Sequence, residues 1–214
     1  GQKFGQALVQ GAIHGLIGAT IGGITGGLVG GISAAIDHRN FWDGSKVINT
    51  EVLADANLPA TIQEGPFDCG YANAQANTGI SQVEYKNKAI ELMKQYPKLY
   101  SEKGVKPKLL KLAIEDLTGK QVMISNDKFP TSIAEIQSYK MWLNQGNRFI
   151  FSSGTETSIN HATSLNKIIV RSVQKLSGSV YHKLFYQIMN TDGGYFKTIP
   201  AKAMNFDLFL RIFP

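Results

Sequence analysis

Residues 61–75 read TIQEGPFDCGYANAQ and contain Cys69, the only cysteine in the chain. Pro66 and Asp68 interrupt or cap the chain before the cysteine, and the residues after it are compatible with a helix, so we expect a helix that begins beside Cys69. The N-terminus of a helix carries partial positive charge and stabilises a thiolate. Gln63 can place its side-chain amide next to the sulfur, with the Cys69 backbone N–H as a second oxyanion donor.

A single cysteine is more often a small buried hydrophobe than a nucleophile, so the interpretation depends on partners elsewhere in the chain. His161 opens a predicted strand in the stretch SINHATSL, where it can act as the base. Asn190 ends a later strand in IMNTDGG, and Asp192 follows it as the alternative acceptor that would fix the imidazole ring. The order of donor, nucleophile, base and orienting residue is that of a thiol hydrolase.

The composition is that of a globular protein, with 43% hydrophobic and 18% charged residues. One cysteine excludes an internal disulfide. The net charge of +6 comes from lysines that are interspersed with acidic residues, so we expect no nucleic-acid partner. No spacing of His, Cys, Asp and Glu is typical of a metal site, and we expect neither a metal nor a cofactor.

Residues 1–43 have a different composition from the rest of the chain. From Phe4 to Ile36 there is no charged side chain, and many glycines are spaced by four. On a helix this spacing makes a smooth face that suits close helix contact, but glycine is a poor helix former in water. The segment therefore needs a partner surface, and two remain open: a membrane in contact with residues 5–36, or the parent carrier polypeptide or a chaperone around residues 1–43.

The remaining sequence predicts a linker at 44–60 and an α+β catalytic domain at 61–214. Capping and stop signals predict helices near 81–96, 106–118 and 132–145. Alternating and β-branched runs predict strands near 120–125, 148–153, 161–170, 180–190 and 195–200. Strands joined by short turns are usually antiparallel, so we expect N-terminal helices packed on an antiparallel sheet.

The order Gln63, Cys69-Gly70, His161 and Asn190 resembles the papain-like cysteine peptidases over roughly residues 60–214. The resemblance implies a papain-like fold and a cysteine peptidase that cleaves a protein. After Cys69-Gly70 the chain has Tyr-Ala, whereas cathepsin-type enzymes have Ser or Ala, then Cys, then an aromatic residue. The spacing from Cys69 to His161 is also shorter than the roughly 130 to 150 residues of that group. The chain is thus more similar to compact bacterial members, in which the third residue is often an aspartate such as Asp192.

The Gly-rich run that ends in NFWDG (40–44) looks like the pre-toxin region of bacterial polymorphic toxins, including those on Rhs carriers. This likeness implies a secreted effector that acts in the cytoplasm of a competing cell and is neutralised by an immunity protein. Two alternatives stay open. The same constellation can deamidate or cross-link glutamine, as in a deamidase or transglutaminase-like toxin, or toxicity can come from a membrane pore formed by the Gly-rich segment.

Overall fold

The computed structural model describes residues 44–99, 101, 104–153 and 161–214, so the predicted Gly-rich segment 1–43 lies outside the described residues. Contacts divide the chain into two compact units. Within the described residues, one unit comprises 50–171 and 183–214, and the other comprises 44–49 and 172–182. Each unit is described by itself, and the candidate site lies in the larger one.

The described residues of the larger unit form an α+β structure with four helices and a sheet, which confirms the expected class. The helices are α3 (Cys69–Thr78), α4 (Gln82–Gln95), α5 (Pro107–Thr118) and α6 (Gln137–Asn144), with short 3-10 turns at Pro97–Leu99 and Ala201–Ala203. The strands are β1 (Lys46–Asp55), β2 (Val122–Ser125), β3 (Arg148–Ser153), β4 (His161–Gln174), β5 (Val180–Asn190), β6 (Tyr195–Pro200) and β7 (Leu208–Ile212), of which β1, β4 and β5 continue into the smaller unit.

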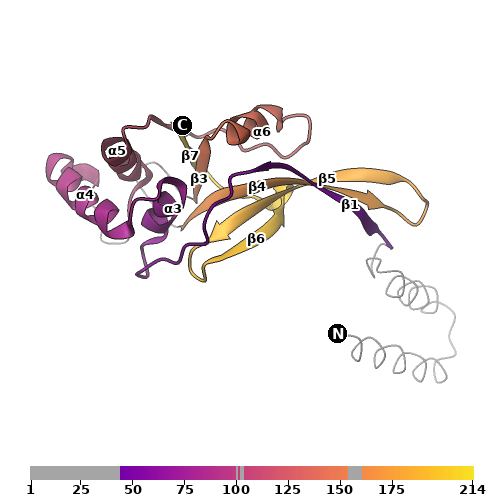
Figure 1. Cartoon of the computed structure of the whole chain (residues 1–214), viewed down its shortest axis with the longest axis horizontal. Coiled ribbons are helices and arrows are strands. Elements are labelled where there is room, and N and C mark those ends of the chain that lie inside the picture. The colour runs from indigo at the N-terminus through magenta and orange to yellow at the C-terminus, as the bar shows by residue number, and fades with distance from the viewer. Residues whose placement is uncertain (1–43, 100, 102–103, 154–160) are drawn as a thin grey trace, which may run out of the picture. The chain divides into compact units, whose positions relative to one another are not determined.

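The strand order of the sheet is β2-β7-β3-β4-β5-β6, and β1 pairs with β4 outside this path. The pairs β2–β7, β3–β7, β3–β4 and β5–β6 are antiparallel, as expected. Figure 1 shows α3, α4 and α5 gathered beside β3 and β7. The order places the start of β4 between β3 and the end of β5, because antiparallel neighbours bring opposite strand ends together.

Alternate residues of the central strands enter two separate hydrophobic cores. Ile150 of β3 and Leu210 of β7 are opposite one another and belong to the core shared with α3, α4 and α5. Phe151 and Phe209 are the next pair and belong to the second core, which includes Leu143 of α6. Side chains alternate across a strand, so both faces of the sheet are covered.

The predicted capping signals locate three helices with different accuracy. The capping box of Ser81 and Glu84 is present at the start of α4, and Gly119 ends α5 in the left-handed conformation. The third helix begins at Gln137, later than the predicted residue 132, because 133–136 form turns. The backbone N–H of Glu135 does donate to the Ser132 hydroxyl at 3.4 Å, but that contact belongs to the turn.

Two strands correct the sequence interpretation. Ten residues of the predicted linker 44–60 form β1, which pairs with β4. Strand β7, near the C-terminus, was not predicted, yet it lies between β2 and β3 and contributes to both cores. Both errors come from polarity patterns: β1 is mostly exposed and mixes charge with apolar residues, whereas β7 is almost wholly buried and lacks alternation.

The smaller unit contains the turn between β4 and β5. The backbone N–H of Lys175 donates to the Ser179 carbonyl at 2.9 Å, and Gly178 has a φ of 83°, which confirms the predicted turn. Gly44 lies against Leu176, since a Cβ at Gly44 would approach the Leu176 side chain to 2.4 Å.

Candidate active site around Cys69

Helix α3 begins at Cys69, as the sequence predicts. A turn precedes it, in which the Asp68 N–H donates to the Gly65 carbonyl at 3.2 Å, and the first helical bond runs from the Ala72 N–H to the Asp68 carbonyl at 2.9 Å. The Asp68 side chain does not cap the helix, contrary to one reading of the sequence; its carboxylate pairs with Lys86 at 2.8 Å. Cys69 therefore lies in the first turn, whose N–H groups have no intrahelical acceptors.

Helix α3 is buried along almost its whole length, and Gly70 permits this packing. A Cβ at Gly70 would lie 2.5 Å from Cγ1 of Val105, closer than real side chains approach. The Cys-Gly pair that resembles a catalytic motif therefore has a packing reason for its glycine. Cys69 is therefore carried on a helix that is closely packed against its neighbours.

The Cys69 side chain is buried, with 7% exposure, and its surroundings act on the sulfur in opposite directions. Burial raises the pKa of the thiol, while backbone hydrogen bonds from Ala162, Gly70 and Cys69 itself lower it and the charge of Asp192 raises it. The net effect is a raised pKa, opposite to the lowering expected from the helix N-terminus. The raised pKa favours the thiol over the thiolate, so a nucleophilic Cys69 would need a base.

Three buried polar side chains join α3 to β4, and one of them bonds to the Cys69 carbonyl. The side-chain amide of Asn73 donates to the Cys69 carbonyl at 2.7 Å and to the Ala162 carbonyl at 3.0 Å. The Ser164 hydroxyl donates to the Asn73 side-chain oxygen at 2.6 Å and accepts from Asn77 at 2.6 Å. The helix that carries the cysteine is thus bonded to the strand that His161 opens.

Gln63 is held beside the end of β5. Its backbone N–H donates to the Thr191 carbonyl at 2.9 Å, and its side-chain oxygen accepts from the Thr191 hydroxyl at 3.1 Å. These bonds leave the NH2 group as the part of the amide that can donate to an oxyanion. Gln82 holds both neighbours of Gln63: its amide donates to the Ile62 carbonyl at 2.9 Å and its oxygen accepts from the Glu64 N–H at 3.1 Å.

The other predicted residues lie at the facing ends of β4 and β5. His161 is the first residue of β4 and is half-buried, and Asn190 is the last residue of β5. The Asn190 side chain is engaged in the β5–β6 turn, where it donates to the Tyr195 hydroxyl at 2.8 Å and accepts from the Asp192 N–H at 3.1 Å. Within the described residues, the His161 ring makes no hydrogen bond to Cys69 or to Asn190.

Hydrogen bonds link Gln63 to Thr191, just beyond the end of β5, and Asn73 links the Cys69 peptide to Ala162 near the start of β4. The structure also reveals supporting residues that the sequence interpretation missed. These are Asn73, Asn77, Gln82, Ser164 and Thr191. One signal was available for two of them, because Asn73 and Asn77 follow Cys69 at the four-residue spacing of a helix face. A polar stripe on a helix that is otherwise buried indicates bonded partners inside the fold.

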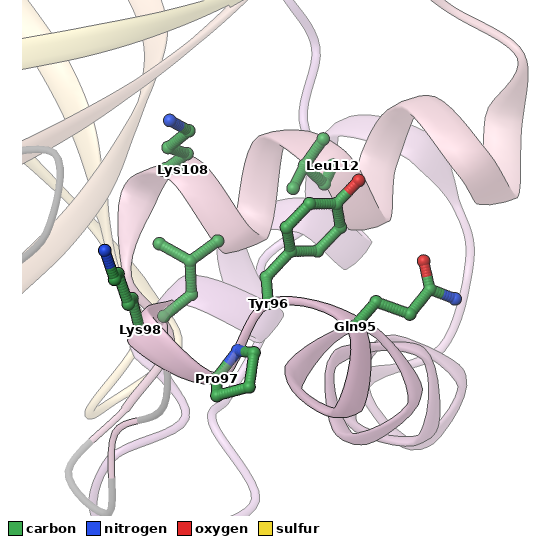
Figure 2. Close-up of a pocket in the computed structure, with 7 residues that line it drawn as sticks. Gln95, Tyr96, Pro97, Lys98, Lys108 and Leu112 are labelled. Atoms are coloured by element: carbon green, nitrogen blue, oxygen red, sulfur yellow. The ribbon is translucent and has the colours of Figure 1, made fainter.

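A cavity of about 540 Å³ lies elsewhere in the same unit, between the end of α4 and the start of α5. Figure 2 shows Tyr96 and Gln95 on one side of it and Leu112 and Lys108 on α5. The lining contains no cysteine or histidine, so it offers no nucleophile of the kind present at Cys69.

Two other kinds of feature are absent from the described residues. No group of three His, Cys, Asp or Glu side chains in the described part of the chain could hold a metal ion. No helix within the described ranges is long and apolar enough to cross a membrane. In the comparisons with known proteins, neither a family model nor a curated protein matches this chain.

Proposed function

We propose that the chain is a papain-like thiol hydrolase that cleaves a protein substrate, with Cys69 as the nucleophile and His161 as the base. One observation carries the proposal. Cys69 begins a buried helix, and the Asn73 amide donates both to the Cys69 carbonyl and to the carbonyl of Ala162, the residue that follows His161. Gln63 is bonded to Thr191, between Asn190 and Asp192, and the charge of Asp192 acts on Cys69. These contacts link the segments that carry the proposed donor, nucleophile, base and orienting residue, which supports the proposal.

Because burial raises the pKa of the Cys69 thiol, the proposed mechanism has proton transfer accompany the attack. His161 takes the thiol proton while the sulfur forms a bond to the carbonyl carbon, and the carbonyl π electrons move to the oxygen. The oxyanion accepts hydrogen bonds from the Gln63 side-chain amide and the Cys69 backbone N–H. When the carbonyl re-forms, the carbon–nitrogen bond breaks, and the protonated His161 gives its proton to the leaving amine.

Water then resolves the thioester, with His161 acting as the base again and Cys69 as the leaving thiol. Asn190 orients the imidazole ring in this proposal, and Asp192 is the alternative. The carboxylate of Asp192 acts on Cys69 through its charge, and Asn190 is bonded within its own turn. Comparing Asn190→Ala with Asp192→Ala separates the two, because only loss of the orienting residue lowers kcat strongly.

The proposed setting is an effector toxin of the polymorphic, Rhs-like kind, which bacteria secrete and deliver into the cytoplasm of a target cell. Its partners would be the substrate protein, an immunity protein in the producing cell, and a carrier polypeptide or chaperone around residues 1–43. The support for this setting is the composition of the Gly-rich segment and the phrase NFWDG. It adds no residue to the proposed reaction.

The proposal is tested by expressing the chain and its Cys69→Ala variant in bacteria, with growth and whole-cell protein mass spectrometry as readouts. We expect growth arrest and new protein termini with the wild type only. Glutamine residues converted to glutamate without new termini would instead identify a deamidase. Growth arrest that persists in Cys69→Ala would refute the thiol mechanism.

Two further versions of the chain serve as controls. A version that lacks residues 1–43 should still arrest growth when it is made inside the cell, because the proposed reaction uses only residues beyond them. Loss of toxicity in this version, with full toxicity in Cys69→Ala, would favour a membrane pore. Thr78→Val removes a half-buried hydroxyl from the same helix, where it contacts the Ala74 carbonyl and Tyr85, and should remain toxic.

A further inference from the structure

We propose that Asn73 and Ser164 are positioning residues, which hold the helix that carries the nucleophile and the strand that carries the base at a fixed separation. The inference deepens the proposed function and rests on it, since it assigns these two residues a role in the same site. Neither residue would touch the substrate. Their effect would pass through Cys69 and Ala162.

The bonds of Asn73 connect the two elements through a single NH2 group. This group donates at once to the Cys69 carbonyl on α3 and to the Ala162 carbonyl on β4. Asn73 is fully buried, with 0% exposure, so no water can replace either bond. The separation of the two peptide groups is therefore set by the size of one planar amide.

Ser164 fixes the orientation of that amide. Its hydroxyl donates to the Asn73 side-chain oxygen at 2.6 Å, so a flipped amide would place NH2 against the hydroxyl hydrogen and oxygen against two carbonyls. Asn77 completes the arrangement by donating to the Ser164 oxygen at 2.6 Å, which leaves the hydroxyl hydrogen for Asn73. The donor and the acceptor of every hydrogen bond in the series from Asn77 through Ser164 and Asn73 to Ala162 are thus determined.

The consequence for the site lies at Ala162. The backbone of Ala162 on β4 and the backbone of Gly70 on α3 both act to lower the pKa of the Cys69 thiol, and the Asn73 amide joins the peptide of Ala162 to that of Cys69. Loss of the Asn73–Ser164 bond should therefore loosen the contact at Ala162 and leave the contact at Gly70 unchanged. A merely structural role would weaken the fold without distinguishing these two contacts.

The experiment is a nuclear magnetic resonance titration of the whole chain, which follows the backbone amides of Ala162 and Gly70 while the Cys69 thiol ionises. Asp192 and His161 also lie near Cys69, so the titration is repeated in Cys69→Ser to identify the step that belongs to the thiol. In the wild type we expect both amide signals to shift with this step. In Ser164→Ala the response of Ala162 should fall to about half or less, because hydrogen bonds weaken steeply as distance and angle depart from the optimum.

The controls separate positioning from stability. Ser164→Thr keeps the hydroxyl and should restore the Ala162 response, and Thr78→Val should lower stability with the response intact. If Ser164→Ala does not fold, Asn77→Ala removes the other bond of the same hydroxyl and should reduce the response less. An Ala162 response that is unchanged in the folded variant would overturn the inference. The titration needs no substrate, so its outcome is independent of whether Cys69→Ala abolishes toxicity.

Discussion

Replacing Gln82 with alanine tests whether the donor segment 62–64 is held in place by this one side chain. Gln82 is only 2% exposed, and all of its side-chain hydrogen-bonding groups point to that segment or to Gln75 of α3. It donates to the Ile62 carbonyl and to the Gln75 side chain, both at 2.9 Å, and accepts from the Glu64 N–H at 3.1 Å. The substitution removes three bonds and shortens a buried side chain.

The expected loss of stability follows from these bonds. A neutral hydrogen bond contributes about 0.5 to 1.5 kcal/mol net, and water can reach some of the abandoned partners because the contacts are partly buried. We therefore expect the free energy of unfolding to fall by about 2 kcal/mol. Displacement of Gln63 should also slow reaction at Cys69 by about tenfold, since small misplacements of catalytic groups cost one to two orders of magnitude.

Urea unfolding measures the stability, and the rate of labelling by a peptide vinyl sulfone measures the reaction at Cys69. Gln137→Ala is the matched control, because its amide makes one exposed bond of 3.2 Å to the Ile133 carbonyl. The control should change stability by less than about 0.5 kcal/mol and leave the labelling rate unchanged. Equal behaviour of the two variants would show that Gln82 does not hold the donor segment.

Three other predictions concern packing and ionisation. Gly70→Ala should lower the free energy of unfolding by about 1 to 3 kcal/mol in urea, because the added methyl would meet Val105, and full stability would show that this contact relaxes freely. Tyr186→Phe should cost about 1 kcal/mol in the same measurement, since it removes a buried hydroxyl bonded to the Pro130 carbonyl at 2.6 Å; an unchanged midpoint would mean that this bond contributes nothing. Because burial raises the pKa of Cys69, the unfolded chain loses the thiol proton first, and stability should fall as pH rises past the ordinary value of 9.0. Cys69→Ala should reduce that fall, whereas an identical pH dependence in both proteins would contradict the raised pKa.

The sequence alone predicted the elements whose signals are local. The box of Ser81 and Glu84, the proline at the start of α5 and the glycine at its end all locate helix boundaries correctly, because each satisfies backbone groups within one turn. Strand β7 was missed because its almost wholly buried residues show no alternation, and its register partners, on β2 and β3, lie far away in the sequence. Residues of β1 likewise form a strand because they pair with β4, although their own composition is that of a linker.

In the candidate site, too, local features could be predicted from the sequence and features that depend on distant segments could not. The position of Cys69 at the start of a helix could be predicted from Pro66 and the residues around it. The raised pKa of the thiol could not, because burial by distant segments outweighs the helix N-terminus. The role of Gln82 was equally hidden, since nothing in the sequence near α4 indicates that its second residue bonds to 62–64.

The central claim is that Cys69 is a nucleophile assisted by His161, and intact-mass measurement after reaction with a peptide vinyl sulfone tests it directly. The Cys69 sulfur would add to the vinyl carbon and the proton would pass to the adjacent carbon, so the whole probe mass is retained on the protein. We predict one adduct, located at Cys69, which forms on the folded chain and is strongly slowed in His161→Ala. An adduct that forms equally fast in His161→Ala, or only after unfolding in urea, would contradict the claim.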